Sequence, residues 1–187
     1  MQHTLIALVE DKPGVLNRVA SLFRRRGFNI DSLTVGRTDQ AGISRMTIVM
    51  DSNTASADRV TSYLYKLVNV IQVEDVTERP SVNRDLAMIK VSVSPTNRTE
   101  IIQLVDVFRA RIVDVANDSL IIEITGDEEK INGFVDVLRP YGIVEMVRTG
   151  IVSMLRGAAN PPTNGNGHNH NGHVFATVNG KVHTLYQ

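Results

Sequence analysis

The residues best suited to bind a ligand form a short turn near the N-terminus, residues 10–16 (EDKPGVL). An apolar segment runs into this turn, and a helical pattern begins directly after Gly14. The first N–H groups of a helix have no partner inside the helix and lie at the positive end of its dipole, so they attract anions. Glycine adds no side chain that would block such a group. The turn is therefore a candidate site for the carboxylate of a small molecule.

The residue types around the turn match an amino acid better than other small anions. Asp11 offers a carboxylate for an ammonium group, and Asn29, at the start of the next strand, offers both a donor and an acceptor. Val15, Leu16 and Ile30 are apolar and would form a wall for an aliphatic side chain. The turn lacks the GxGxxG pattern of dinucleotide sites. A single glycine between a strand and a helix is a weak signal, and a helix start without any ligand is the alternative interpretation.

Periodic apolar residues predict the elements that hold the turn. Residues 3–10 are mostly aliphatic and indicate a strand that is covered on both faces. The next segment has apolar residues at the spacing of one helix face, namely Leu16, Val19, Ala20 and Phe23. Further strands and one helix are predicted, in the order strand, strand, helix, strand, at residues 29–38, 44–51, 57–68 and 70–77. This β-α-β-β-α-β order predicts a ferredoxin-like domain over residues 1–78, with two helices on one face of an antiparallel sheet.

The same order of elements repeats after a polar linker at residues 79–83. We therefore expect an α+β protein with two tandem ferredoxin-like βαββαβ domains, the second at residues 84–157. Asn97 and Glu100 have the spacing of a capping box at the start of the second domain's first helix. No glycine precedes that helix, so only the first domain is expected to bind a ligand.

Residues 158–187 differ in composition from the two predicted domains. Residues 160–173 are mostly Asn, Gly, Pro and His, which indicates a flexible linker. The alternating apolar residues beyond it and the Asn179-Gly180 pair predict a β-hairpin that docks on this chain or on a partner. Three histidines have a spacing that would chelate a metal loosely, and a chance feature of composition is the better interpretation of His168, His170 and His173.

The amino-acid composition and net charge of the chain argue against several classes of function. The 187 residues include 20 basic and 20 acidic side chains, and this balance argues against a chain built to neutralise nucleic-acid phosphates. Cysteine is absent, which excludes disulfides, thiolate metal sites and cysteine nucleophiles. No apolar run is long enough to span a membrane, and polar residues follow the N-terminus too soon for a signal peptide. A cytoplasmic protein is therefore expected.

The two predicted domains lack a catalytic constellation. His3 is their only histidine, no pair of carboxylates shares an evident cleft, and there is no phosphate loop, so we expect a binding protein and not an enzyme. Arg24, Arg25 and Arg26 are interpreted as a solvated helix end in preference to a phosphate site. Arg45 alternates with an apolar face, and it is either an ordinary exposed residue or a partner contact.

Two longer strings resemble a known family. The first is LVEDKPGVLNRVASLFRRRGFNIDSLTVGRTDQAGISRMTIV, which is similar to the N-terminal ACT domain of the small regulatory subunit of acetolactate synthase (acetohydroxyacid synthase). The second is LRPYGIVEMVRTGIVSMLRG, which resembles the C-terminal domain of that family. The resemblance covers residues 1–157 and leaves residues 158–187 outside it.

The resemblance implies a function for the turn. In that family the large subunit performs the thiamine-diphosphate-dependent condensation of pyruvate with pyruvate or 2-oxobutyrate, and it would hold that cofactor together with Mg²⁺ and FAD. The small subunit holds no cofactor, raises the activity, and confers feedback inhibition by a branched-chain amino acid, usually valine. The resemblance thus implies a non-catalytic regulatory subunit whose partner is the large subunit. Its location would be the cytoplasm, or the plastid stroma of a photosynthetic eukaryote.

ACT domains of this type pair side by side, and the resemblance implies that the effector lies at the interface of a homodimer. When the family's effector contacts are carried over by position, the resemblance implies that one protomer supplies Asp11, Gly14, Val15 and Leu16. The other protomer would supply Asn29 and Ile30. An acid stands at position 11 where relatives commonly have an amide. This charge would strengthen the ammonium contact or change which amino acid is preferred.

Two alternatives from other classes remain open. A stand-alone amino-acid sensor or transcriptional regulator would use the same site, but it needs a nucleic-acid-binding module for which the sequence shows no pattern. A metal-handling protein would use the histidines of the tail and would bind zinc stoichiometrically. The identity of the branched-chain effector, the surface that meets the large subunit and the number of copies are not determined by the sequence.

Overall fold

The computed structural model describes residues 2–51, 57–157, 175–178 and 181–184. The chain divides into two compact units. The first contains residues 1–82 together with 153–187, and the second contains residues 83–152.

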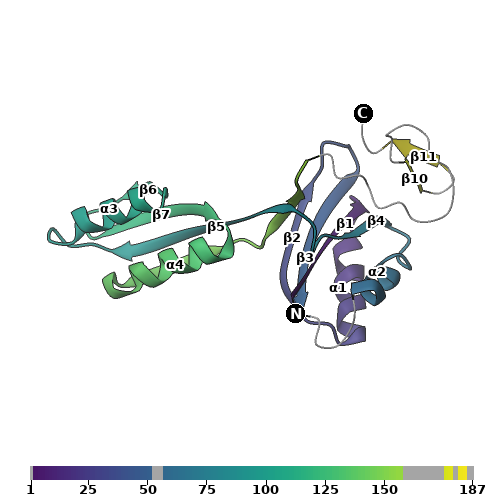
Figure 1. The fold of residues 1–187 in the computed structure, drawn as a ribbon, viewed down its shortest axis with the longest axis horizontal. Helices are drawn as coiled ribbons and strands as arrows, with labels where there is room; N and C mark the ends of the chain where they lie inside the picture. Colours follow the sequence, from purple (N-terminus) through teal and green to yellow (C-terminus); the bar gives the residue numbers. More distant parts are fainter. Residues whose placement is uncertain (1, 52–56, 158–174, 179–180, 185–187) are drawn as a thin grey trace. The chain divides into compact units, whose positions relative to one another are not determined.

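The first unit contains a four-stranded antiparallel sheet with the strand order β2-β3-β1-β4. Its elements are, in chain order, β1 (Gln2–Glu10), α1 (Val15–Arg26), β2 (Ile30–Arg37), β3 (Ile43–Asp51), α2 (Ala57–Leu64) and β4 (Val70–Asp75). Both helices lie on one face of the sheet (Figure 1). This is the ferredoxin-like arrangement that the sequence predicts.

Helix α1 begins and ends at glycines with left-handed backbones. Gly14 has φ of 84° and Gly27 has φ of 70°, a conformation that costs side-chain-bearing residues free energy. The buried face of the helix is formed by Val15, Val19, Leu22 and Phe23. The predicted face was wrong at Leu16 and Ala20, both of which are exposed, because the helix turns a neighbouring stripe toward the sheet. Leu16 is thereby left free beside the turn.

The face of this sheet that points away from the helices is also covered. Strand alternation places Ile6, Thr47 and Val49 on that face, yet each is at most 4% exposed. A strand that the sequence does not predict, β9 (Val152–Leu155), contributes buried Ser153 to this unit. The carbonyl of Ser153 accepts a hydrogen bond from the Arg45 side chain at 2.7 Å.

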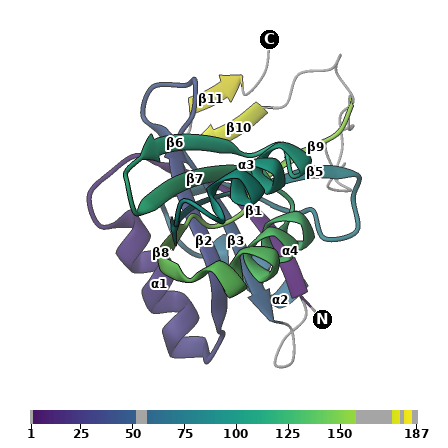
Figure 2. The ribbon, with the colours of Figure 1, turned by 90° about the vertical axis from the view of Figure 1, so that its left-hand side faces the viewer.

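The second unit repeats the plan, with the strand order β6-β7-β5-β8. Its elements are β5 (Ser81–Ser92), α3 (Arg98–Val107), β6 (Arg111–Val115), β7 (Ser119–Gly126), α4 (Glu128–Leu138), the 3-10 helix η1 (Arg139–Tyr141) and β8 (Ile143–Arg148). Figure 2 shows helices α3 and α4 beside strands β5 and β7. Buried side chains of these helices and strands form a second core. The two cores confirm the expected fold class.

Four local predictions differ from the structure. Residues 81–83 form the start of β5 where a linker was predicted, and β5 pairs with β9 as well as with β7 and β8. Helix α2 ends at Leu64, short of the predicted end at Val68. Asn97 does precede α3, but its side chain accepts from the backbone N–H of Ser94 at 2.7 Å, so the predicted capping box does not form. Residues 153–157, expected in the second domain, group with the first unit.

The tail contains the predicted hairpin. Strand β10 (Phe175–Val178) pairs antiparallel with β11 (Lys181–Thr184). The Asn179-Gly180 turn, the predicted linker and the three histidines, His168, His170 and His173, lie outside the described residues. No helix in the described part of the chain is long and apolar enough to cross a membrane.

Candidate functional site

The turn before α1 offers an open space lined by backbone donors. A Cβ atom added to Gly14 would meet no heavy atom within 4 Å. Within the described residues, no side chain caps the first turn of α1, so the N–H groups of Leu16 and Asn17 have no hydrogen-bond partner. An anion placed here would contact these N–H groups and the positive end of the helix dipole.

The turn is held to its neighbours by backbone hydrogen bonds. The N–H of Asp11 donates to the carbonyl of Gly42 at 2.7 Å, and the N–H of Glu10 donates to the carbonyl of Asn69 at 2.9 Å. The first bond ties the turn to the start of β3, and the second ties it to the segment before β4. The position of the donors therefore depends on contacts that are distant in sequence.

A polar network beneath the turn centres on Asn69, which is buried. The Asn69 side chain donates to Glu10 Oε2 at 2.5 Å and accepts a hydrogen bond from Arg18 of α1. Lys12 Nζ lies 3.1 Å from the same Glu10 oxygen. The hydrogen bond from Asn69, together with Lys12, lowers the pKa of the Glu10 carboxyl from its ordinary value. Sequence reasoning missed this network because a single loop asparagine carries no periodic signal.

The carboxylate of Asp11 is already paired in this structure. Its Oδ2 lies 3.2 Å from Nε of Arg37, at the end of β2. The Arg37 side chain is 86% exposed and that of Asp11 is 40% exposed, so the pair is worth at most about 1 kcal/mol. An incoming ammonium group would compete with Arg37 for this carboxylate at little cost.

The two apolar residues that follow Gly14 have different environments. Val15 is buried in the core of the first unit, so only its backbone faces the turn. Leu16 is 45% exposed and is the apolar side chain next to the open space. Of the two apolar site residues in this turn, Leu16 is therefore the one whose side chain is available to a ligand.

The remaining predicted site residues, Asn29 and Ile30, lie at the opposite end of the sheet in the same chain. Ile30 is opposite Met50, which is opposite His3, whereas the turn follows Glu10 at the other end of β1. His3 and Glu10 are seven residues apart, which corresponds to about 23 Å along a strand. One chain alone does not bring the two halves of the predicted site together.

Asn29 is exposed and its amide is engaged only locally. Its Nδ2 donates to Oδ1 of Asp31 at 2.7 Å. Ile30 is half-buried against the core. Both residues thus lie at the start of the edge strand β2, Asn29 directly before it and Ile30 as its first residue.

The fold and the turn define a class, a protein built from tandem ferredoxin-like units of the ACT type. Residues 5–72 match a family model described as an AHAS small subunit-like ACT domain. Residues 84–157 match a second model described as the small subunit of acetolactate synthase. The chain belongs to the acetolactate synthase small-subunit family.

Individual relatives agree with this assignment. A probable acetolactate synthase small subunit from Archaeoglobus fulgidus is 55% identical over 84% of this chain and 98% of its own. The acetolactate synthase small subunit of Mycolicibacterium smegmatis is 53% identical over 83% of this chain and 91% of its own. The crystal structure of the small subunit from Thermotoga maritima is similar with a TM-score of 0.79 and 40% identity, covering 84% of this chain and 98% of that one.

The described residues do not point to a metal site. Among them, no group of three or more His, Cys, Asp or Glu side chains is arranged to hold a metal ion. At the turn, the structure offers backbone N–H groups, the Asp11 carboxylate and the apolar Leu16 side chain for contact with a ligand.

Proposed function

We propose that this chain is the non-catalytic regulatory subunit that binds the thiamine-diphosphate-dependent large subunit and makes it responsive to a branched-chain amino acid. The observation that carries this proposal is the division of the site. Because the open donors at Gly14 and the exposed amide of Asn29 lie at opposite ends of one sheet, the proposed site would draw its residues from two copies. The cofactors, thiamine diphosphate, Mg²⁺ and FAD, are assigned to the large subunit.

The geometry of β2 explains how two copies complete the site. Strand β2 is an edge of its sheet, and it runs from Ile30 at one end to Arg37 at the other. If two copies pair their β2 strands antiparallel about a two-fold axis, the start of one β2 comes to lie beside the end of the other. Asn29 and Ile30 of the second copy then lie beside Arg37, Asp11 and the turn.

The two edges of the sheet differ in their capacity to accept another strand. On β4 the hydroxyl of Tyr65 accepts from the N–H of Val73 at 3.0 Å and donates to its carbonyl at 3.2 Å. These contacts occupy backbone groups that a further strand would need. In the described part of the chain no strand pairs with the outer side of β2, and Val35 on that strand is 42% exposed. The open edge therefore supports β2 as the dimer contact.

The completed site would recognise each part of an aliphatic amino acid. The N–H groups of the first turn of α1 bind the carboxylate, and Asp11 binds the ammonium group after releasing Arg37. Leu16 of one copy and Ile30 of the other contact the aliphatic side chain, and valine is the proposed effector. Its binding changes the relative stability of two dimer arrangements that the large subunit distinguishes, and a coupling of about 1–3 kcal/mol is sufficient.

Reconstitution tests the proposal directly. The purified chain is mixed with the large subunit, and acetolactate formation is measured alone and with valine, leucine or isoleucine. We expect higher activity with the chain present, and inhibition by at least one of the three amino acids. Failure to bind the large subunit would contradict the proposal, and salt-sensitive retention on DNA would favour the alternative of a transcriptional regulator.

A further inference from the structure

The chain passes between its two units twice, each time within a strand. The first passage lies between residues 82 and 83 in β5, and the second lies between residues 152 and 153 in β9. Strands β5 and β9 are paired with each other. We call these paired strands the connector. The connector is the covalent route along which a change in one unit can reach the other.

The end of the connector in the first unit is fastened by two arginines. The backbone N–H of Arg156 donates to the carbonyl of Pro80 at 2.8 Å, and its Nε donates to the carbonyl of Ser81 at 3.2 Å. Nη2 of Arg45, on β3, donates to the carbonyl of Ser153 at 2.7 Å. Arg45 is therefore a side chain that joins β3, a central strand of the first sheet, to the connector.

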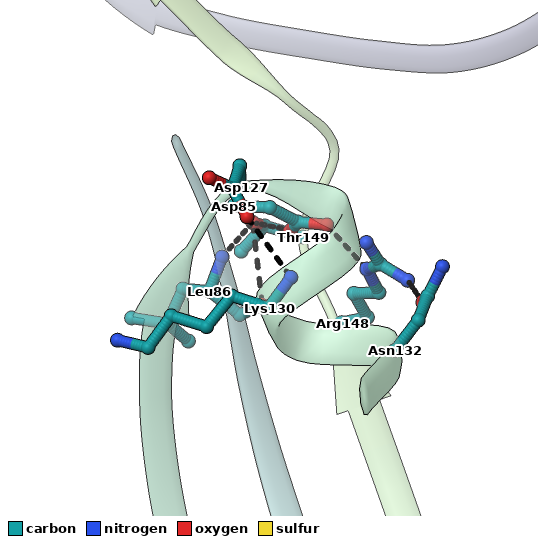
Figure 3. A network of polar contacts seen from close by, with 7 residues as sticks. All are labelled: Asp85, Leu86, Asp127, Lys130, Asn132, Arg148 and Thr149. Atoms are coloured by element: carbon teal, nitrogen blue, oxygen red, sulfur yellow. Dashed lines mark hydrogen bonds and ion pairs between the residues drawn. The ribbon is translucent and has the colours of Figure 1, made fainter. Parts of the chain in front are cut away.

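The end of the connector in the second unit is fastened by a buried carboxylate (Figure 3). Asp85 is only 3% exposed and is paired with Arg148, and it also accepts a hydrogen bond from Thr149 Oγ1 at 2.9 Å. The N–H of Thr149 donates to the carbonyl of Leu86 at 2.9 Å, and the N–H of Leu86 donates to Thr149 Oγ1 at 3.1 Å. Nη1 of Arg148 also donates a hydrogen bond to Oδ1 of Asn132, on α4, at 2.8 Å.

Arg45 is close in the chain to the contact that positions the turn. The carbonyl of Gly42, which accepts the Asp11 N–H at 2.7 Å, lies three residues before Arg45. Arg45 is also opposite Leu8 on β1 and Gly36 on β2, one residue before Arg37, which pairs with Asp11. Arg45 therefore lies on the strand between β1, which leads to Asp11, and β2, which carries Arg37.

We propose that Arg45, through its hydrogen bond to Ser153, transmits occupancy of the amino-acid site to the connector and so to the second unit. This inference rests on the proposed function, and it adds a residue that acts in regulation without touching the effector. Coupling of this kind requires a contiguous physical contact between the site and the element that changes. The contact between Arg45 and Ser153 has that character, because the Arg45 side chain is half-buried and its acceptor residue is buried.

The test uses the Arg45→Ala variant to distinguish a loss of valine binding from a loss of transmission. Three quantities are measured for the full chain: valine affinity by calorimetry, activation of the large subunit, and inhibition of the reconstituted enzyme by valine. We expect valine affinity and activation to be retained and the coupling between valine and activity to fall on the order of tenfold. Arg45→Lys keeps one donor and should restore part of the inhibition.

A matched control removes an arginine from the same connector. Arg84→Ala deletes an exposed guanidinium whose hydrogen bond goes to the carbonyl of the adjacent Asn83 at 2.7 Å, and inhibition should be unchanged. Thr149→Val removes the hydroxyl at the other end of the connector and should reduce inhibition as Arg45→Ala does. This second variant keeps the test decisive if Arg45→Ala does not fold.

The outcomes that overturn the inference are distinct from those that overturn the proposed function. If the Arg45→Ala variant is inhibited normally, Arg45 has no role in transmission. If the variant loses valine binding together with inhibition, Arg45 acts in binding and not in transmission. If the unsubstituted chain neither binds valine nor confers inhibition, the proposed function fails first and this inference fails with it. Unchanged hydrogen exchange of residues 83–88 in the unsubstituted chain on valine addition would also contradict it.

Discussion

Gly14 decides what the first turn of α1 can accept. Its backbone has φ of 84°, and a side chain added there would project into open space. That space adjoins the N–H groups of Leu16 and Asn17, which have no partner within the described residues. A residue that fills the space changes the site without disturbing the core, because Val15 already anchors the helix there.

Gly14→Asp should abolish inhibition by valine while activation of the large subunit persists. The new carboxylate occupies the position of the effector's carboxylate and repels it. Gly14→Ala is the control, since it carries the same backbone strain of about 1–2 kcal/mol without the charge, and it should weaken inhibition less. Valine titrations of the reconstituted enzyme compare the two. Normal inhibition in the Asp variant would show that the site is elsewhere.

Glu10 should contribute to stability in a pH-dependent way. Its pKa in the folded chain is lowered from 4.5 by Asn69 and Lys12, so the carboxylate stabilises the fold above the unfolded pKa. This contribution is lost as the pH falls through the lower folded value. Glu10→Gln should therefore be less stable than the unsubstituted chain at neutral pH, and the difference should shrink in acid.

Urea unfolding at neutral and acidic pH measures this difference for Glu10→Gln. Glu78→Gln, at an exposed acid outside the network, serves as the control. A stability difference that grows toward acid would contradict the assigned role of the Glu10 carboxylate.

At the scale of elements, the two edges of the first sheet have opposite roles. On strand β4 the Tyr65 hydroxyl occupies the backbone N–H and carbonyl of one residue, Val73. Strand β2 has no strand on its outer side among the described elements. One edge is thus protected against pairing and the other remains available, which limits how two copies can associate.

Tyr65→Phe should lower the free energy of unfolding by about 1–2 kcal/mol, because two backbone groups of Val73 lose their partner. Tyr63→Phe is the matched control, since it keeps the ring that lies 4.2 Å from the Arg26 guanidinium. Urea unfolding at neutral pH measures the free energy of unfolding of both variants. Equal effects of the two substitutions would argue against protection of the β4 edge by Tyr65.

At the scale of the whole molecule, the proposed site exists only in an assembly. The two halves of the site lie at opposite ends of one sheet, so dimerisation and effector binding should be linked. The second unit has the same fold but no glycine before α3, and it is joined to the first by the connector.

Val35→Glu should weaken dimerisation and valine binding together, because it places two charges at the proposed β2 contact. Val113→Glu on β6 is the control, since Val113 is 50% exposed on the edge strand of the second unit, and it should leave both properties unchanged. Sedimentation analysis and calorimetry give the two quantities. A monomeric Val35→Glu variant that binds valine normally would show that the site is not shared.

Much of this protein follows from its sequence because the relevant signals are local. The period of the apolar residues specified the four helices and the sheets, and the Pro13-Gly14 turn marked the start of α1. Boundaries failed where distant contacts intervene: residues 81–83 begin β5, which pairs with β9, and α2 ends before Tyr65, whose hydroxyl binds β4. Local patterns do not encode such contacts.

The sequence by itself therefore determined the fold class, the family and the position of the donor-rich turn. The tertiary structure alone decided that Gly14 and Asn29 lie at opposite ends of a sheet, that Asn69 supports the turn, and that Arg45 contacts Ser153. The physical reason is the range of the interactions. Helix periodicity and glycine conformation act over a few residues, whereas strand register and buried polar contacts join residues up to 108 positions apart.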